Sequence, residues 1–434
     1  MAVSVKPGIG FAACAALVVA NMVGTGVFTS LGFQLAEIPS RPAIMLLWLL
    51  GGILSLCGAL SYAELAAALP RSGGEYHFLG RIFHPAIGFM AGLVSMVVGF
   101  AAPCALAAMA FGSYLSGVFP QTPPLAASCA VVLVVTAFHL RTLAVSSVFQ
   151  IVFTVLKIAL VVFLSVALLG GPSSEPEPAA PWFEYVVSSP FAVSLMYTLY
   201  AYSGWNAATY VLGEVRAPSK VVPRALASGT LLVTALYLAL NYAFLRAAPA
   251  QQMAGELNVA QIAAGAVLGE AGGRVVAVVI SAGLVSALSA MIWAGPRVAM
   301  VLAEDHPRFF GLLRRRNTDG IPVPAVIFQS ALTLLLLLTA TFEQVLVCTQ
   351  LALLACGFLV VVGLMVLRWR EPLLPRPFRV PLYPLTPLLF LAISAFAMVY
   401  TAVSRPFEAM CGAVTMLLGL LLYFAARGDG KSAA

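Results

Sequence analysis

The sequence is poor in charge. Of its 434 residues, 9% are Asp, Glu, Lys or Arg, whereas 62% are hydrophobic and the mean hydropathy is +1.01. A soluble domain has about 25% charged residues, because charged side chains cover much of its surface. The composition therefore excludes a soluble protein, and no stretch of the chain is polar enough to form a separate soluble domain.

Patterns that would indicate a metal site or a disulfide framework are also missing. The seven cysteines, at positions 14, 57, 104, 129, 348, 356 and 411, fall in apolar stretches, and none belongs to a CxxC pair. Zinc sites and disulfide-rich domains need cysteines at such short or paired spacings. The apolar stretches also lack the paired carboxylates, HExxH spacing or Ser–His arrangement that hydrolysis needs. We therefore expect no metal, no cofactor and no enzyme activity.

What the sequence has in abundance is apolar runs long enough to cross a membrane. A hydrocarbon core of about 30 Å needs about 20 apolar residues in a helix. Twelve such runs predict an all-α polytopic membrane protein with twelve transmembrane helices. They lie near residues 10–35, 43–69, 85–118, 124–140, 145–170, 190–213, 222–245, 274–303, 322–341, 344–367, 383–403 and 407–426.

Basic residues are distributed unevenly between the connections of these runs. With the N-terminus inside, the outer connections hold only Arg41, Arg246, Arg274 and Arg405, and one of them carries acidic residues at 175, 177 and 184. Basic connections stay on the cytoplasmic side. The pattern predicts a multi-pass protein of the cell membrane with both termini cytoplasmic, and it explains the net charge of +7 without a nucleic-acid partner. The inner set is Lys6, Arg71, Arg81, Arg141, Arg216, Lys220, Arg224, Arg297, Arg308, Arg314, Arg315, Arg316, Arg368, Arg370, Arg376, Arg379, Arg427 and Lys431.

Two predicted spans are interrupted near their middle. The first contains Gly24, Thr25 and Gly26 in ANMVGTGVFTS, and the sixth contains Ser203 and Gly204 in LYAYSGWN. With five spans in each half, the second half is inverted relative to the first, and inverted repeats with broken helices characterise secondary transporters. This predicts a first repeat over 10–170, a second repeat over 190–367 and two accessory helices over 383–426. Alternatively, the glycines serve only close helix packing.

The two interruptions offer complementary backbone groups. Non-helical backbone at membrane depth is tolerated only where it is buried in protein or lines a cavity. The half-helix after Gly24 presents free N–H groups and a positive dipole end, which suit a carboxylate. The half-helix that ends near Tyr200 and Ala201 presents free carbonyls, which suit an ammonium group. Together they predict a site for the zwitterionic head of an amino acid.

Lys157, in FTVLKIALVVF, is the only ionisable residue far inside a span. It lies about 18 Å into the fifth span at 1.5 Å per residue, where a charge costs a few kcal/mol and usually faces the bundle interior. Its ammonium either takes the place of a bound cation and braces the first span against the eighth, or releases a proton during transport. A third possibility is that it only locks two helices by pairing with carbonyls.

Acidic residues are found only near the ends of the spans. Glu64 and Glu214 lie at cytoplasmic ends, where we expect them to pair with arginines of the connections. A cationic side chain of a bound amino acid would lack a counter-ion in the middle of the bilayer, and so would an acidic one. The sequence therefore favours a neutral amino acid.

Several longer motifs resemble one family. GTGVF after Asn21, LSYAELAAALPRSGGEYHFLGR, LYAYSGWN with GEVRAPSKVVPRAL, AGPRVAMVLAEDHPRFF and PRPFRVPLYPL are similar to segments of the amino acid–polyamine–organocation superfamily. Within it, the chain looks most like the L-type amino-acid transporters and their bacterial relatives, from about residue 10 to 425. The resemblance implies a LeuT-type fold with a 5+5 inverted repeat and alternating access around a central site.

The resemblance also implies roles for single residues. Thr25 and Gly26 would contact the substrate carboxylate, with Asn21 and Gly24 beside them, and the backbone around Tyr200, Ala201, Ser203 and Gly204 would receive the amino group. Tyr200 matches an aromatic residue that closes over the substrate. Lys157 matches a lysine at a sodium position, which implies sodium independence, and Tyr237 matches a tyrosine near that lysine.

The sequence also departs from this family. Eukaryotic L-type members join a heavy chain through a cysteine between spans three and four, and GVFPQTPPLAAS has none, so we expect no disulfide-linked partner. Span eight lacks the usual Ser-Thr-Phe-Gly-Ser run, which leaves Ser286 and Ser289 as candidate partners for Lys157 or substrate. The expected function is sodium-independent exchange of neutral amino acids. Proton-coupled symport is the alternative, and an amino-acid sensor a remote one.

Overall fold

The computed structural model describes residues 8–141, 147–174, 182–305, 310–318 and 320–427. Within these ranges the regular structure is helical, apart from an isolated parallel bridge between Ile9 and Val215. Lys6, Glu175, Glu177, Arg308 and Lys431, which contributed to the predicted topology, lie outside the described residues. The apolar composition and the membrane-length spacing therefore led to the correct fold class.

The helices of the first part of the chain surround the first interruption. They are α1 (Phe11–Met22), α2 (Gly26–Glu37), α3 (Arg41–Ala68), α4 (Gly74–Ile82), α5 (Pro85–Met96), the π-helical turn η1 (Val97–Ala101), α6 (Ala102–Val118), α7 (Pro124–His139) and α8 (Ser147–Gly170).

The second part contains the second interruption, between α9 and η3. Its helices are η2 (Trp182–Glu184), α9 (Ser189–Tyr202), the 3₁₀ helix η3 (Ala207–Glu214), α10 (Pro218–Ala247), α11 (Ala250–Met253), α12 (Val259–Asp305), α14 (Val323–Thr339), α15 (Phe342–Arg370), α16 (Leu385–Ser404) and α17 (Pro406–Arg427). A non-helical glycine, Gly269, kinks α12.

Local sequence explains several helix starts. The Ser188 hydroxyl accepts a hydrogen bond from the Phe191 N–H at the start of α9. At the start of α15, Thr341 and Gln344 form a capping box in which each side chain accepts from the other residue's backbone N–H. Such caps satisfy N–H groups that have no intrahelical partner.

Nine helical segments of the described chain are long and apolar enough to span a membrane, and α7 and α14 are shorter apolar helices. The sixth predicted span, 190–213, is divided between α9 and η3, so neither piece reaches spanning length alone. The polytopic helical fold is confirmed, whereas the count of twelve spans and the inverted-repeat boundaries stay predictions.

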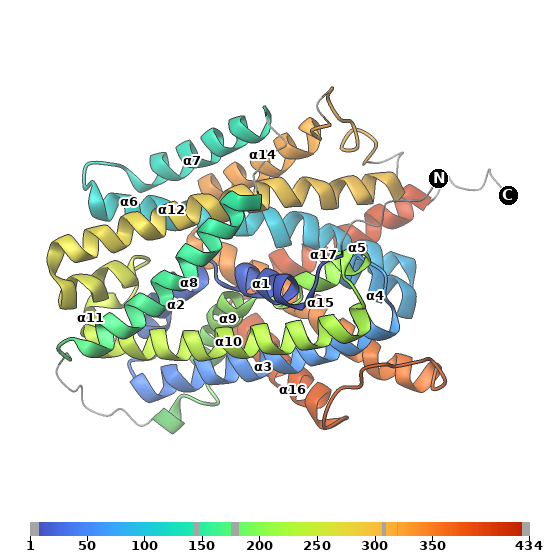
Figure 1. Cartoon of the computed structure of the whole chain (residues 1–434), viewed down its shortest axis with the longest axis horizontal. Helices are drawn as coiled ribbons and strands as arrows, with labels where there is room; N and C mark the ends of the chain where they lie inside the picture. Colours follow the sequence, from blue (N-terminus) through green and yellow to red (C-terminus); the bar gives the residue numbers. More distant parts are fainter. Residues whose placement is uncertain (1–7, 142–146, 175–181, 306–309, 319, 428–434) are drawn as a thin grey trace.

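The helices form two groups. The α3–α10 group comprises α1, α2, α3, α9 and α10, in which α10 packs against α1 and α3, and α9 packs against α2 and α3. The α6–α12 group comprises α5, α6, α7, α12 and α14, in which α6 packs against α7 and α12. Figure 1 shows α6, α7, α12 and α14 along the upper part of the molecule and α5 to the right of the centre, with α3 and α10 along the lower part and α1, α2 and α9 between them. Helix α8 contacts both α10 and α12 and so bridges the groups.

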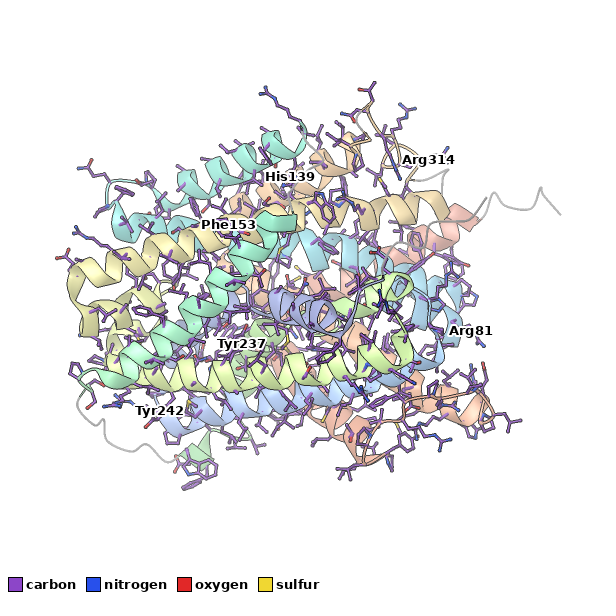
Figure 2. The ribbon with its side chains drawn as sticks, viewed as in Figure 1. Arg81, His139, Phe153, Tyr237, Tyr242 and Arg314 are labelled. Atoms are coloured by element: carbon purple, nitrogen blue, oxygen red, sulfur yellow. The ribbon has the colours of Figure 1, made fainter. Side chains whose placement is uncertain are left out.

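Basic side chains gather at one end of the molecule. Figure 2 shows Arg81 and Arg314 at the right end, whereas Tyr242, near the C-terminal end of α10, lies at the left. The end of α17 lies on the same side of the molecule as α4, which contains Arg81 (Figure 1). This arrangement agrees with the uneven distribution of basic residues in the sequence.

Glu64 forms the most deeply buried ion pair described at this end. Its carboxylate is inaccessible to solvent and accepts hydrogen bonds from Arg368 Nε (2.8 Å) and the Val380 N–H (2.7 Å), while Arg376 Nε lies 3.5 Å away. The expectation that Glu64 pairs with arginines of the connections is confirmed. The cluster ties the end of α3 to α15 and to the connection that follows α15.

We expect Glu64→Gln to lower the free energy of unfolding by about 3 kcal/mol, because removing one partner of a buried ion pair leaves the other charge uncompensated. Unfolding in detergent should measure this. The control is Glu371→Gln, whose partner Arg81 is half-exposed at 2.9 Å and which should cost less than about 1 kcal/mol. Equal losses would contradict the assigned role of the Glu64 cluster.

Candidate functional site

The first interruption separates two helices by three residues. Helix α1 ends at Met22 and α2 begins at Gly26, so Val23, Gly24 and Thr25 form a non-helical link. The first N–H groups of α2 have no acceptor within the helix, and the positive end of its dipole lies at this link. The link is thus suited to hold an anion.

The second interruption exposes the opposite helix end. Helix α9 ends at Tyr202, and Gly204 has φ of +100°, a conformation that favours glycine. The Ser203 N–H donates to the Tyr200 carbonyl, but the last carbonyls of α9 have no further turn to accept from. These carbonyls and the negative dipole end suit a cation such as a substrate ammonium group.

The two interruptions touch each other. The Thr25 hydroxyl and the Tyr200 hydroxyl are hydrogen-bonded at 3.1 Å. A Cβ atom on Gly26 would lie 2.5 Å from the Ala201 Cα, and one on Gly204 would lie 2.8 Å from the Asn21 carbonyl oxygen. Such distances are shorter than real Cβ contacts, so both positions require glycine. The structure therefore brings the predicted residues of both interruptions together.

Asn21 contributes differently from its neighbours. Its side-chain amide is exposed and donates to the Leu17 carbonyl one turn earlier in α1, at 2.8 Å. Its backbone carbonyl, by contrast, faces Gly204. The backbone of Asn21, rather than its side chain, therefore belongs to the contact between the interruptions.

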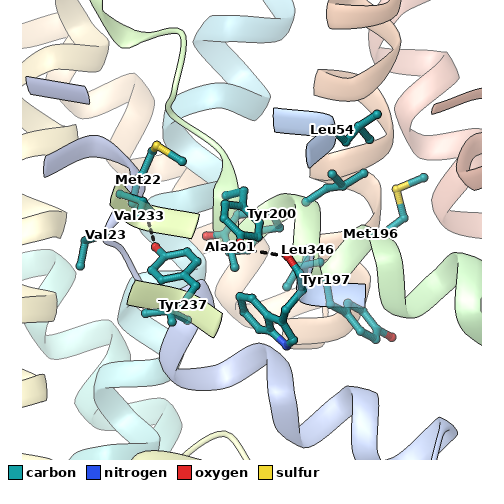
Figure 3. Close-up of a cluster of buried hydrophobic side chains, with 14 of the residues drawn as sticks. Met22, Val23, Leu54, Met196, Tyr197, Tyr200, Ala201, Val233, Tyr237 and Leu346 are labelled. Atoms are coloured by element: carbon teal, nitrogen blue, oxygen red, sulfur yellow. Dashed lines mark hydrogen bonds between the residues drawn. The ribbon is translucent and has the colours of Figure 1, made fainter. Parts of the chain in front are cut away.

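Lys157 and Tyr237 cap the end of α1. The Lys157 ammonium donates to the Val23 carbonyl at 2.8 Å, and the Tyr237 hydroxyl donates to the Met22 carbonyl at 2.7 Å. Figure 3 shows the Tyr237 hydroxyl directed at Met22, with Tyr200 and Ala201 nearby. A cation is favourable at a helix C-terminus because it compensates the dipole and the unpaired carbonyls. Lys157, which belongs to α8, thus compensates the negative dipole end of α1.

The neighbour of Lys157 on α12 is a glycine. A Cβ on Gly283 would lie 3.4 Å from the Lys157 Cγ, so α12 packs closely on the lysine stem. A narrow cleft between α2, α8 and α12 reaches the lysine and is lined by Gly24, Phe28, Leu156, Lys157, Leu160, Val279, Ile280, Gly283, Leu284 and Ala287. The lysine is therefore braced between the first interruption and α12.

Two of the serines of α12, Ser286 and Ser289, are the candidate partners of Lys157 or substrate. Ser289 is hydrogen-bonded to His139 Nε2 at 2.9 Å and so links α12 to α7. In this structure Gly283 of α12, and not Ser289, is the residue placed beside the lysine stem. Ser286 is buried, and a contact of either serine with substrate stays a prediction.

Glu75 is a buried acidic residue that the sequence analysis used only as part of a family motif. Its carboxylate accepts hydrogen bonds from the Tyr62 hydroxyl (3.0 Å), the Asn206 amide (2.5 Å) and the Tyr210 hydroxyl. It joins α4 to α3 and to the segment that follows the second interruption. In the sequence, Glu75 and Asn206 both lie in motifs of the family resemblance, but nothing there indicates that they meet.

A second cluster lies at the opposite end of α2 and α9. Arg405, between α16 and α17, lies 2.6 Å from the Glu343 carboxylate and 3.4 Å from that of Glu37, and the Tyr197 hydroxyl donates to Glu343. The Phe33 and Phe342 rings stack beside it, with centroids 5.5 Å apart. The cluster joins α2, α9 and α15. In the sequence, nothing indicates that these charged residues, which lie at the ends of different spans, contact one another.

Comparison with known proteins agrees with this geometry. The family model described as amino acid permease matches residues 9–422, which is nearly the whole chain. The chain belongs to the amino acid permease family. The match covers both interruptions, Lys157 and the helices of both groups, so this permease is a polytopic membrane transporter and not an enzyme.

Curated relatives of the permease are similar over most of its length. It is 28% identical to the Asc-type amino acid transporter 1 of Mus musculus, over 97% of this chain and 81% of that protein. It is 27% identical to the serine/threonine exchanger SteT of Bacillus subtilis (strain 168), over 96% of both chains. The large neutral amino acids transporter small subunit 2 of Mus musculus is 29% identical over 97% of this chain and 81% of that protein.

We expect Gly26→Ala to weaken amino-acid binding by at least roughly tenfold, or 1.4 kcal/mol, because the added methyl would push α2 away from the Ala201 backbone. Gly26→Val should abolish binding. Equilibrium binding of a labelled neutral amino acid to purified protein would measure both. The control is Gly265→Ala in α12, where a Cβ would meet no atom within 4 Å.

Both variants should insert into the membrane as the wild type does. If Gly26→Val bound and transported amino acids normally, the binding site would have to lie elsewhere than at the interruptions.

Proposed function

We propose that this permease exchanges neutral amino acids across the cell membrane, without sodium, by alternating access. The observation that carries the proposal is the contact between two broken helices whose facing ends have opposite polarity. The N-terminus of α2 is suited to a carboxylate, and the C-terminus of α9 is suited to an ammonium group. An α-amino acid carries both groups on one carbon.

The absence of charged side chains at the interruptions supports a neutral substrate. The link residues 23–25 and 203–206 carry no ionisable group. The nearest described cation, Lys157, already donates to Val23. Bringing an uncompensated charge into such a site is costly. The names of the relatives, which include neutral amino-acid transporters and a serine/threonine exchanger, support the same substrate class.

Sodium independence rests on Lys157. Its ammonium occupies the position next to the free carbonyl end of α1, where a bound cation would otherwise compensate the helix dipole. A covalently attached cation does not need to be supplied from solution. In this proposal the bond from Lys157 to Val23 forms and breaks as α1 moves during the transport cycle.

The proposed cycle needs a gate at each end, and two clusters are suited to this role. The Arg405, Glu343 and Glu37 cluster closes one end, where the Gly255 N–H also donates to the Gly32 carbonyl of α2 at 2.8 Å. At the other end, Glu75 holds the segment that follows the second interruption through a hydrogen bond from Asn206. Opening either end would require one of these clusters to separate.

Topology and partners follow from the same proposal. The end that carries Arg81 and Arg314 would face the cytoplasm, together with both termini. The connection between α6 and α7 contains no cysteine, which supports a transporter without a disulfide-linked heavy chain. The amino-acid substrate and the lipid bilayer are then its partners.

Transport in liposomes tests the proposal. Purified protein would be placed in liposomes loaded with unlabelled neutral amino acids, and uptake of labelled alanine, leucine and serine would be followed without sodium, with and without an inward proton gradient. We expect uptake that requires internal amino acid and ignores the gradient. Uptake into empty liposomes that depends on the gradient would instead establish a proton symporter, and binding without any uptake would indicate a sensor.

The variant Lys157→Ala gives a separate prediction. Removing the Lys157 ammonium leaves the Val23 carbonyl without its donor in a region of low dielectric, which costs about 1–3 kcal/mol. We expect a lower exchange rate with amino-acid binding retained, measured by uptake and by equilibrium binding. If a proton-driven uptake exists and is lost in this variant while exchange persists, Lys157 belongs to a proton path.

A further inference from the structure

The connection between α15 and α16 is a folded structure with two different faces. We define the interfacial segment as residues 369–385. On its inner face, the Val380 N–H donates to Glu64, and the Arg376 guanidinium donates to the carbonyls of Glu371 and Leu374, both at 2.9 Å. The bond to Glu64 holds the segment against α3, and a further bond from Arg376 to the Leu367 carbonyl (3.2 Å) holds it against the end of α15.

The outer face of the segment presents large apolar side chains. Trp369 is 82% exposed, Leu373 94% and Leu382 76%. Exposed apolar side chains at this density would be unfavourable in water, because each Å² left uncovered forgoes about 25 cal/mol. An apolar environment around these three side chains would therefore be favourable.

The depth of the segment points to the lipid headgroup region. Helix α15 has 29 residues, which makes it about 43 Å long at 1.5 Å per residue, whereas the hydrocarbon core is about 30 Å thick. The helix is therefore longer than the hydrocarbon is thick, and its last turn carries Arg368 and Arg370 on either side of Trp369, which favours a place outside the hydrocarbon. Tryptophan is enriched at this depth, since its ring is apolar and its N–H is polar. Figure 1 shows the segment projecting sideways at the lower right, beside α16 and away from α7 and α14.

The charge of the segment selects the kind of lipid. Of its ionised groups, Arg376 is directed inward toward Glu64, and Glu371 is paired with Arg81. Arg370 and Arg379 are exposed, although Arg370 Nη1 also donates to the Ile82 carbonyl at 3.3 Å, and they leave the segment with an excess of positive charge. Arginine binds phosphate through several N–H groups at once, and basic groups next to a membrane surface attract anionic lipids.

We propose that residues 369–385 form an interfacial anchor that binds anionic phospholipid headgroups, with Trp369, Leu373 and Leu382 among the lipid chains and Arg370 and Arg379 at the phosphates. The anchor is joined through Val380 and Arg368 to Glu64 at the end of α3. Bound lipid would therefore stabilise the same end of the helix bundle that the Glu64 cluster holds.

Fluorescence quenching in nanodiscs tests the anchor. The full-length protein would be placed in phosphatidylcholine nanodiscs that contain a small fraction of lipid brominated near the top of its acyl chains, as phosphatidylglycerol or as phosphatidylcholine. The difference in emission between wild type and Trp369→Phe isolates Trp369 among the five tryptophans. We expect brominated phosphatidylglycerol to quench this difference more than the same fraction of brominated phosphatidylcholine.

The arginines provide the variant and its control. In Arg370→Gln/Arg379→Gln, the preference for phosphatidylglycerol should fall by roughly fivefold for each arginine removed, and in the wild type it should fall with added salt. The control Arg314→Gln/Arg315→Gln removes the same charge from exposed positions of another connection and should keep the preference. All four replaced arginines are exposed, so the fold should persist.

Three results would overturn the proposal. Emission from Trp369 that no brominated lipid quenches would mean that a second copy or another protein covers the face. Equal quenching by both lipids would mean that the face has no preference for anionic headgroups. Displacement of brominated phosphatidylglycerol by free glycerol phosphate would mean that a soluble phosphate, and not a lipid, occupies the site.

Discussion

Pairing of backbone groups inside the bilayer is the constraint on which the rest of this structure depends. A helix that stops in hydrocarbon leaves N–H and carbonyl groups with no water to pair with. In this permease α1 stops at Met22, and the carbonyls of Met22 and Val23 are satisfied by Tyr237 from α10 and Lys157 from α8. The carbonyl end of the break is thus closed by protein, whereas the first N–H groups of α2 have no acceptor within their own helix, and Gly26 lies against Ala201 of α9.

The bonds of Lys157 and Tyr237 differ in what they connect. Tyr237 belongs to the same α3–α10 group as α1, so its bond can persist whenever that group moves as a unit. Lys157 belongs to α8, the helix that packs on both α10 and α12. Its bond to Val23 therefore links the α3–α10 group to the helix that bridges the two groups. The Tyr114 hydroxyl of α6 makes a similar crossing to the Phe28 carbonyl at 2.9 Å. Relative motion of the two groups would strain or break these bonds.

Charged residues are few in this chain, and most of those that are buried lie at the ends of helices in clusters. Glu64 and Glu75 are buried and Glu343 is partly buried, and each receives several donors from other parts of the chain. A buried carboxylate is tolerated only when it is paired and hydrogen-bonded, so each cluster specifies which helix ends meet. Charged residues are scarce in this chain, and the ion pairs that specify contacts between helices therefore lie at the two ends of the bundle.

The sequence by itself determined the membrane-embedded helical fold, the two broken helices and the buried lysine, because hydropathy, glycine and an intramembrane charge are local signals. Glu64 was also placed correctly, since a span-end acid among inner arginines needs a partner nearby. Only the tertiary structure decided that Gly26 meets Ala201, that Lys157 bonds Val23 while Ser289 bonds His139, and that Glu75 joins Tyr62, Asn206 and Tyr210. These contacts join residues far apart in the chain, and they depend on helix rotation and packing, for which a single sequence carries no periodic signal.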